Sequence, residues 1–181
     1  MNRLLSNSLI ALFVVSSLAI QTKVHLYDHY EDEGGPKHNT QAPDFTLQTL
    51  DGKSVSLSQH KGEPVVIDFF ATWCAPCKLE LATLKAWHTK RVNHGRKTIT
   101  VLVVGLDKNG DDLRYYVKNH PNPFTMLHDP GSTVAMQYNV KGVPTVCLID
   151  KDGKVLYVQV GLTPGLSYLL DEFADGRLGM R

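Results

Sequence analysis

Residues 65–77, VVIDFFATWCAPC, join a mostly apolar run to two cysteines that lie three positions apart. The first six residues of this stretch are nearly all apolar, which is typical of a strand covered on both faces. Residues 75–92 then have the apolar spacing of a helix, with one face formed by Cys77, Leu81, Leu84 and His88. Pro76 suits the first turn of that helix. The order of strand, short loop and helix therefore predicts that Cys74 lies at a helix N-terminus.

Strand and helix patterns alternate on both sides of this segment. A hairpin is expected over residues 45–57, around the turn dipeptide Asp51-Gly52. Further strands are expected at 98–106, 145–149 and 155–160, and further helices at 111–119, 131–138 and 166–173, the first of them starting near an Asp cap. Strands separated by helices pair in parallel, and the hairpin formed by the last two strands adds antiparallel pairing. We therefore predict an α/β fold with a mixed central sheet, helices on both faces and an N-terminal hairpin.

The N-terminus has the pattern of an export signal. In residues 1–19, one Arg precedes an apolar run that ends in small residues, as in a secretory signal peptide; an uncleaved anchor over residues 4–20 is the alternative. Residues 20–40 are expected to form a polar linker, 41–175 the domain and 176–181 a tail. The 181 residues carry a net charge of only +1 with no basic block, which argues against nucleic-acid binding. The chain is therefore expected to act outside the cytoplasm, for example in a periplasm.

The CxxC pair predicts redox chemistry. At a helix N-terminus, unpaired N–H groups and the helix dipole favour the thiolate of Cys74 over its thiol. Cys77 lies one turn further along, close enough to form a disulfide but deeper in the structure. We expect Cys74 to attack and Cys77 to resolve the mixed disulfide. A structural zinc site needs two more ligands; the third cysteine, Cys147, stands alone in an apolar run and is expected to be a buried apolar residue.

The segment 69–78, FFATWCAPCK, resembles the active-site segment of the thioredoxin superfamily. Residues 42–45 (APDF), the hairpin LDGK at 50–53 and an extra helical stretch between residues 106 and 143 are similar to the TlpA/ResA/DsbE-like branch. The resemblance covers residues 41–175 and implies a thioredoxin-like fold with a helical insertion and no cofactor. Members of that branch are exported thiol–disulfide oxidoreductases, usually membrane-tethered, that keep cysteines of other proteins reduced, often those of apocytochrome c. A reductase of this kind needs a membrane electron donor.

The resemblance also implies roles for individual residues. Pro144 matches the cis proline that faces the CxxC motif, where Val143 pairs with an extended substrate; a proline that merely starts a strand is the alternative. Asp68 matches a buried proton-exchanging carboxylate, although many TlpA-like proteins carry other residues there, and a surface Asp at a strand end is the alternative. Glu80 matches the acidic residue of the CxxCxxE pattern that tunes the thiol, against a solvated helix Glu. Trp73 is expected to flank the site, exposed to substrate.

Three other functions are weighed against a disulfide reductase. A copper carrier of the same fold would be expected to have a wider cysteine spacing and a partner histidine, and neither is present. A peroxide-reducing enzyme would have Thr or Ser three residues before the nucleophile, where this chain has Ala71, and Pro where it has Ile67. A thiol oxidant or isomerase stays open, although the Ala-Pro pair between the cysteines lacks the His of strongly oxidising relatives.

Overall fold

The computed structural model of the chain describes residues 34–178. The predicted signal peptide or anchor over 1–19, the tether over 4–20, residues 20–33 of the predicted linker and residues 179–181 of the tail lie outside the described residues. Residues 35–40 hydrogen-bond to the rest of the domain: the Gly35 N–H donates to the carbonyl of Asn139 at 2.9 Å, and the Val155 N–H donates to the carbonyl of Thr40 at 2.9 Å. This segment is therefore held against the domain.

A seven-stranded mixed sheet forms the centre of the structure, in the order β2-β1-β5-β4-β3-β6-β7. Its strands are β1 (Thr46–Thr49), β2 (Ser54–Ser56), β3 (Val65–Phe70), β4 (Thr100–Gly105), β5 (Thr125–His128), β6 (Thr145–Ile149) and β7 (Val155–Val160). The three central strands β3, β4 and β5 are parallel, whereas β6, β7 and the N-terminal hairpin pair antiparallel. The expected mixed sheet is confirmed.

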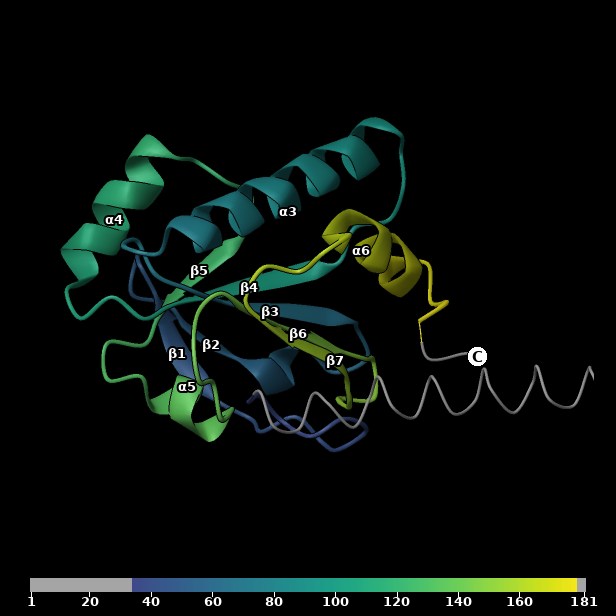
Figure 1. Cartoon of the computed structure of the whole chain (residues 1–181), viewed down its shortest axis with the longest axis horizontal. Helices are drawn as coiled ribbons and strands as arrows, with labels where there is room; N and C mark the ends of the chain where they lie inside the picture. Colours follow the sequence, from purple (N-terminus) through teal and green to yellow (C-terminus); the bar gives the residue numbers. More distant parts are fainter. Residues whose placement is uncertain (1–33, 179–181) are drawn as a thin grey trace, which may run out of the picture. The chain divides into compact units, whose positions relative to one another are not determined.

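Helices cover both faces of this sheet (Figure 1). They are η1 (Leu57–His60), α3 (Ala75–Asn93), α4 (Gly110–Asn119), α5 (Thr133–Gln137) and α6 (Leu166–Ala174). In Figure 1, α3 and α6 lie on one side of the sheet and α5 lies on the other. The expected α/β architecture with helices on both faces is therefore confirmed.

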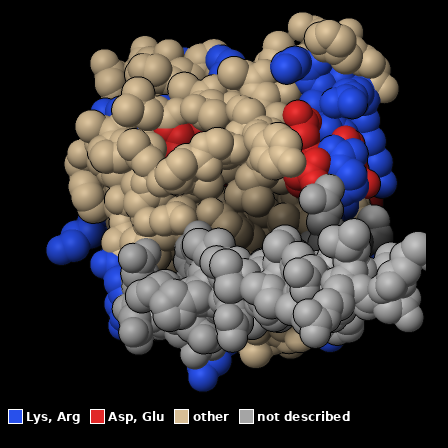
Figure 2. Space-filling view, turned by 45° about the vertical axis from the view of Figure 1, so that its right-hand side comes forward, with Lys and Arg blue, Asp and Glu red and all other residues tan. Residues whose placement is uncertain are grey.

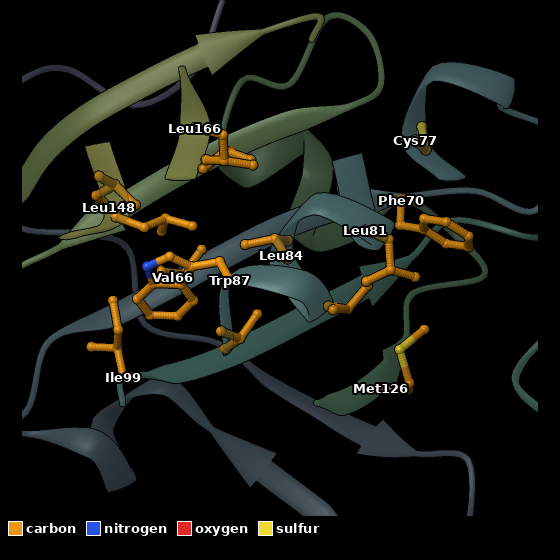
Figure 3. Close-up of a cluster of buried hydrophobic side chains, with 14 of the residues drawn as sticks. Val66, Phe70, Cys77, Leu81, Leu84, Trp87, Ile99, Met126, Leu148 and Leu166 are labelled. Atoms are coloured by element: carbon orange, nitrogen blue, oxygen red, sulfur yellow. The ribbon is translucent and has the colours of Figure 1, made fainter. Parts of the chain in front are cut away.

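Side-chain alternation along the central strands divides the core between the two faces. Val66 and Phe70 of β3 pack with α3 and α6, and Figure 3 shows Cys77 at one edge of this cluster. Ile67 and Phe69 point to the opposite face and pack with α5 and the segment before β1. Each cluster contains fully buried residues of β3, so this strand is covered on both faces, as its apolar run predicts.

Three local predictions are wrong. Strand β5 was not expected: its four residues lie inside the stretch interpreted as a helical insertion, and pairing with β1 and β4 makes them a strand. Helix α4 begins one residue earlier than expected, and its cap is Asn109, whose side chain accepts from the Asp111 N–H at 3.0 Å. On α3, Trp87 takes the buried position expected for His88, which is only partly buried and packs edge-on against Phe124.

Helices α3 and α6 are joined by a buried cation. Arg91 of α3 is almost fully buried and binds Asp171 within α6 at 2.7 Å and Asp175 at the C-cap of α6 at 2.6 Å. Its Nε donates to the carbonyl of Lys97. Figure 2 shows basic and acidic groups interleaved on the right-hand side, beside a large uncharged surface. Within residues 34–178, no helix is both long enough and apolar enough to span a bilayer.

Candidate active site

The two cysteines of the CxxC motif lie at the start of α3, bonded to each other. Cys74 is the N-cap residue, as predicted, and its Sγ accepts a hydrogen bond from the Cys77 N–H at 3.1 Å. Cys74 is 5% exposed, whereas Cys77 is fully buried. The Cys74–Cys77 disulfide closes this pair. The N–H contact reaches the sulfur that would carry the negative charge after reduction, so the helix start favours a thiolate at Cys74.

The loop before β6 faces this disulfide. The Val143–Pro144 peptide is cis, and the Val143 carbonyl oxygen lies 3.5 Å from Cys74 Sγ. A proline nitrogen carries no hydrogen, so Pro144 presents no donor toward the sulfurs. The structure thus brings Cys74, Val143 and Pro144 together, although they are about seventy residues apart along the chain.

Asp68 lies in the apolar layer between the sheet and α3. Its side chain lies on the same face of β3 as those of Val66 and Phe70, the face that α3 covers. It is fully buried, and among residues 34–178 neither carboxyl oxygen has a hydrogen-bond partner. Burial raises the pKa of Asp68 well above its ordinary value, and the charge of Glu80 adds to the rise. The surface alternative for Asp68 is therefore wrong.

Glu80 is also buried, on the inner face of α3, so a solvated helix carboxylate is excluded. Its Oε2 accepts a hydrogen bond from the Thr163 N–H at 2.7 Å, and its Oε1 has no hydrogen-bond partner within the described part of the chain. Burial raises the pKa of Glu80, and the bond from Thr163 lowers it in part. Two interacting carboxyl groups, on β3 and α3, therefore lie on the buried side of the site, each with a tendency to hold its proton.

Two exposed apolar side chains lie on segments that contribute to the site. Trp73, beside Cys74 in sequence, is 72% exposed, as expected for a residue at the entrance. Leu162 is 47% exposed, and the segment that carries it is held on both sides of the residue: the Gly161 N–H donates to the Pro144 carbonyl at 2.8 Å, and Thr163 binds Glu80. Apolar groups at such an edge suit contact with another polypeptide.

Sequence reasoning missed Leu162 and Thr163. They follow β7 and reach the site only because β7 pairs with β6, which brings the end of β7 beside Pro144. No local pattern marks them, since their positions depend on the strand order.

Cys147 is a free cysteine, fully buried in β6, and it packs in the cluster on the α5 face. Burial raises the pKa of its thiol, so the thiolate is disfavoured. Within residues 34–178, the structure brings together no set of three or more His, Cys, Asp or Glu side chains that could hold a metal ion. The CxxC motif is therefore the reactive centre that the described residues assemble.

Comparison with known proteins agrees with this geometry. Residues 38–158 match the AhpC/TSA family. The chain is 30% identical over 156 residues to the thiol-disulfide oxidoreductase ResA of Bacillus thuringiensis, covering 86% of each protein. It is 32% identical over 138 residues to the thioredoxin-like protein YneN of Bacillus subtilis, covering 76% of this chain and 80% of that one. A crystal structure from Chlorobium tepidum, assigned as a thiol:disulfide interchange protein DsbE, superposes with a TM-score of 0.67 at 34% identity and covers 79% of this chain and 99% of that one.

Proposed function

We propose that this chain, which belongs to the AhpC/TSA family and is a thiol–disulfide oxidoreductase of the ResA/DsbE type, reduces disulfides of exported proteins outside the cytoplasm. The observation that carries the proposal is the position of Cys74. It is the N-cap of α3, its Sγ accepts a hydrogen bond from the Cys77 N–H, and it is 5% exposed whereas Cys77 has no exposed surface. Family membership indicates the reaction class, and the geometry of the site supports Cys74 as the attacking thiol.

The reaction begins with the reduced protein. The Cys74 thiolate attacks one sulfur of a substrate disulfide, the substrate S–S bond breaks, and one substrate thiolate leaves. The Cys77 thiol then loses its proton and attacks Cys74 Sγ. This step breaks the mixed disulfide, releases the second substrate thiolate and forms the Cys74–Cys77 disulfide that the structure contains. Two electrons pass from the dithiol to the substrate.

Asp68 and Glu80 are proposed to handle the Cys77 proton. Cys77 has no exposed surface, so its proton cannot pass directly to solvent. Glu80 lies one helical turn from Cys77, and Asp68 lies on the sheet face that α3 covers. A member of this pair that is ionised gains stability by taking up a proton in the apolar layer, which suits it to accept the proton that the buried thiol loses.

The substrate is proposed to bind as an extended segment along Val143 and Pro144, with Trp73 and Leu162 in contact with its side chains. The Val143 carbonyl lies beside Cys74, where pairing with a substrate backbone would bring a substrate sulfur to the nucleophile. Disulfides of exported proteins, apocytochrome c among them, form the proposed substrate class. A membrane electron donor is the proposed source of the electrons that restore the dithiol.

Residues 1–19 are proposed to direct export, either as a cleaved signal peptide or as an anchor that tethers the domain to the membrane. Residues 20–40, of which 35–40 hydrogen-bond to the domain, would then connect this segment to it.

The function is tested with two cysteine variants and a redox titration. We expect Cys74→Ser to abolish reduction of a CxxC peptide disulfide, and Cys77→Ser to accumulate the mixed disulfide with that peptide, visible by mass spectrometry. Equilibration with a dithiothreitol series should give a potential near the reducing end of the range for this fold, about −270 mV, rather than near −120 mV. Full activity in Cys74→Ser would refute the proposed nucleophile, and a potential at the oxidising end would reverse the proposed direction.

A further inference from the structure

A buried carboxylate outside the CxxC motif holds the loop that leads into it. Asp107 lies two residues after the end of β4 and is only 3% exposed. Its Oδ1 and Oδ2 accept from the Thr72 backbone N–H at 3.2 Å and 3.1 Å, and its Oδ1 also accepts from the Thr72 hydroxyl. Thr72 lies two residues before Cys74.

The hydrogen bonds around Thr72 explain why this loop needs an anchor. The last ladder contact of β3 with the chain after β4 is the Leu106 N–H donating to the Phe70 carbonyl at 2.9 Å. Beyond Phe70 the chain turns, and the Cys74 N–H donates to the Ala71 carbonyl at 3.1 Å. The Thr72 N–H is left without a strand partner and is satisfied by the Asp107 side chain. One side chain thus fixes the turn between the strand and Cys74.

Asp107 is itself held in place. The His128 ring, through Nε2, donates to the Asp107 backbone carbonyl at 2.8 Å, which ties the end of β4 to the end of β5. The anchor for the active-site turn is therefore set by two neighbouring parallel strands rather than by a mobile surface group.

We propose that Asp107 is the positioning residue of the active-site turn, holding Thr72 so that Cys74 stays at the N-cap of α3 with its sulfur on the Cys77 N–H. The inference rests on the proposed role of Cys74 as the nucleophile. Without the carboxylate, the turn samples other conformations, and Cys74 Sγ spends less time within hydrogen-bond distance of that donor. The thiolate is then less stabilised and less well aimed.

The test separates the acceptor oxygens of Asp107 from its charge. Asp107→Asn removes the charge but keeps an oxygen for the Thr72 N–H, whereas Asp107→Ala removes both. Because neither variant carries a charge, the difference between them reports the anchor alone. The measurements are the Cys74 thiolate pKa in the reduced protein, from its ultraviolet absorbance against pH, and the rate of reduction of a peptide disulfide.

We expect a higher Cys74 pKa in Asp107→Ala than in Asp107→Asn, and a rate about tenfold lower. Equal pKa values and equal rates in the two variants would overturn the inference. If Asp107→Ala does not fold, Asp107→Leu takes its place, because it is also neutral, has a side chain of similar shape to Asn and offers no acceptor to the Thr72 N–H. Its Cys74 pKa should then be higher than that of Asp107→Asn, and equal pKa values would overturn the inference.

Asp112→Ala is the matched control. Asp112 is an exposed residue that lines the same surface groove as Asp107 and Trp73, and its variant should match the native chain in both measurements. If Asp112→Ala raised the Cys74 pKa and lowered the reduction rate as much as Asp107→Ala does, any charge in the groove would act alike. That result would overturn the role of Asp107. Failure of the proposed function would be recognised by a different result, namely full activity in Cys74→Ser.

Discussion

Replacing Asp68 with Asn should change how the stability of the domain depends on pH. Asp68 is fully buried, and neither of its carboxyl oxygens has a hydrogen-bond partner in the range 34–178 that the structure describes. Burial raises its pKa well above the ordinary value, so the folded protein keeps a proton that the unfolded chain has released. In the unfolded chain this proton leaves near pH 3.9, the approximate value for a free Asp.

The size of the expected pH dependence follows from the binding of one proton. Between about pH 4 and the folded-state pKa, the folded state binds one proton more than the unfolded state at this residue. The free energy of unfolding of the native chain therefore falls by about 1.4 kcal/mol per pH unit from Asp68 alone, then levels off above the folded pKa. Asn does not titrate, so the free energy of unfolding of Asp68→Asn should rise relative to that of the native chain by this slope as the pH increases.

The assay is urea unfolding of the oxidised protein, in which Cys74 and Cys77 do not titrate, across about pH 4 to 8. Glu80 also has a raised pKa and adds a slope of the same sign, so Glu80→Gln is also compared with the double variant that carries Asp68→Asn as well, which isolates the Asp68 slope. Asp112→Asn, which removes an exposed carboxylate, should shift stability by less than about 0.5 kcal/mol. Stability curves that run parallel for the native chain and Asp68→Asn would refute the reasoning that this carboxyl group is buried without a partner.

Three further predictions concern α3 and its packing. Glu80→Gln should slow the attack of Cys77 on the mixed disulfide by about 10² and flatten its pH profile, since Gln accepts no proton; stopped-flow measurement of the second step would contradict this if its rate were unchanged. Leu84→Ala should lower the free energy of unfolding by about 2–5 kcal/mol, because Leu84 is fully buried in the cluster under α3; calorimetry showing a loss below about 1 kcal/mol would argue against that packing. Arg91→Ala should lower the free energy of unfolding by about 2 kcal/mol, because it leaves Asp171 and Asp175 without their charge-assisted hydrogen bonds. Urea unfolding that showed no such loss would contradict a stabilising role for these ion pairs.

The reactive motif and its helix were predictable from local sequence. An apolar run ending in a loop, then Pro76 in the first turn of an apolar-faced helix, places Cys74 at the N-cap, and the structure confirms that position. The same periodicity failed for His88, because Trp87 fills the space over the sheet and periodicity alone does not separate two neighbouring positions. Strand β5 was missed because four residues after two prolines carry too little pattern, and only pairing with β1 and β4 makes them a strand.

By itself, the sequence determined the chemistry available to this protein: two thiols one helical turn apart, with an acidic residue one turn further along the same helix. Local spacing is sufficient for that, since the geometry of a helix relates residues three and four apart. Only the tertiary structure decided what surrounds the thiols. The strand order brings Pro144 and Thr163 to the site and places Asp107 against Thr72, and it leaves Asp68 with no hydrogen-bond partner among the residues that the structure describes. Side chains far apart in the chain meet only when the sheet assembles.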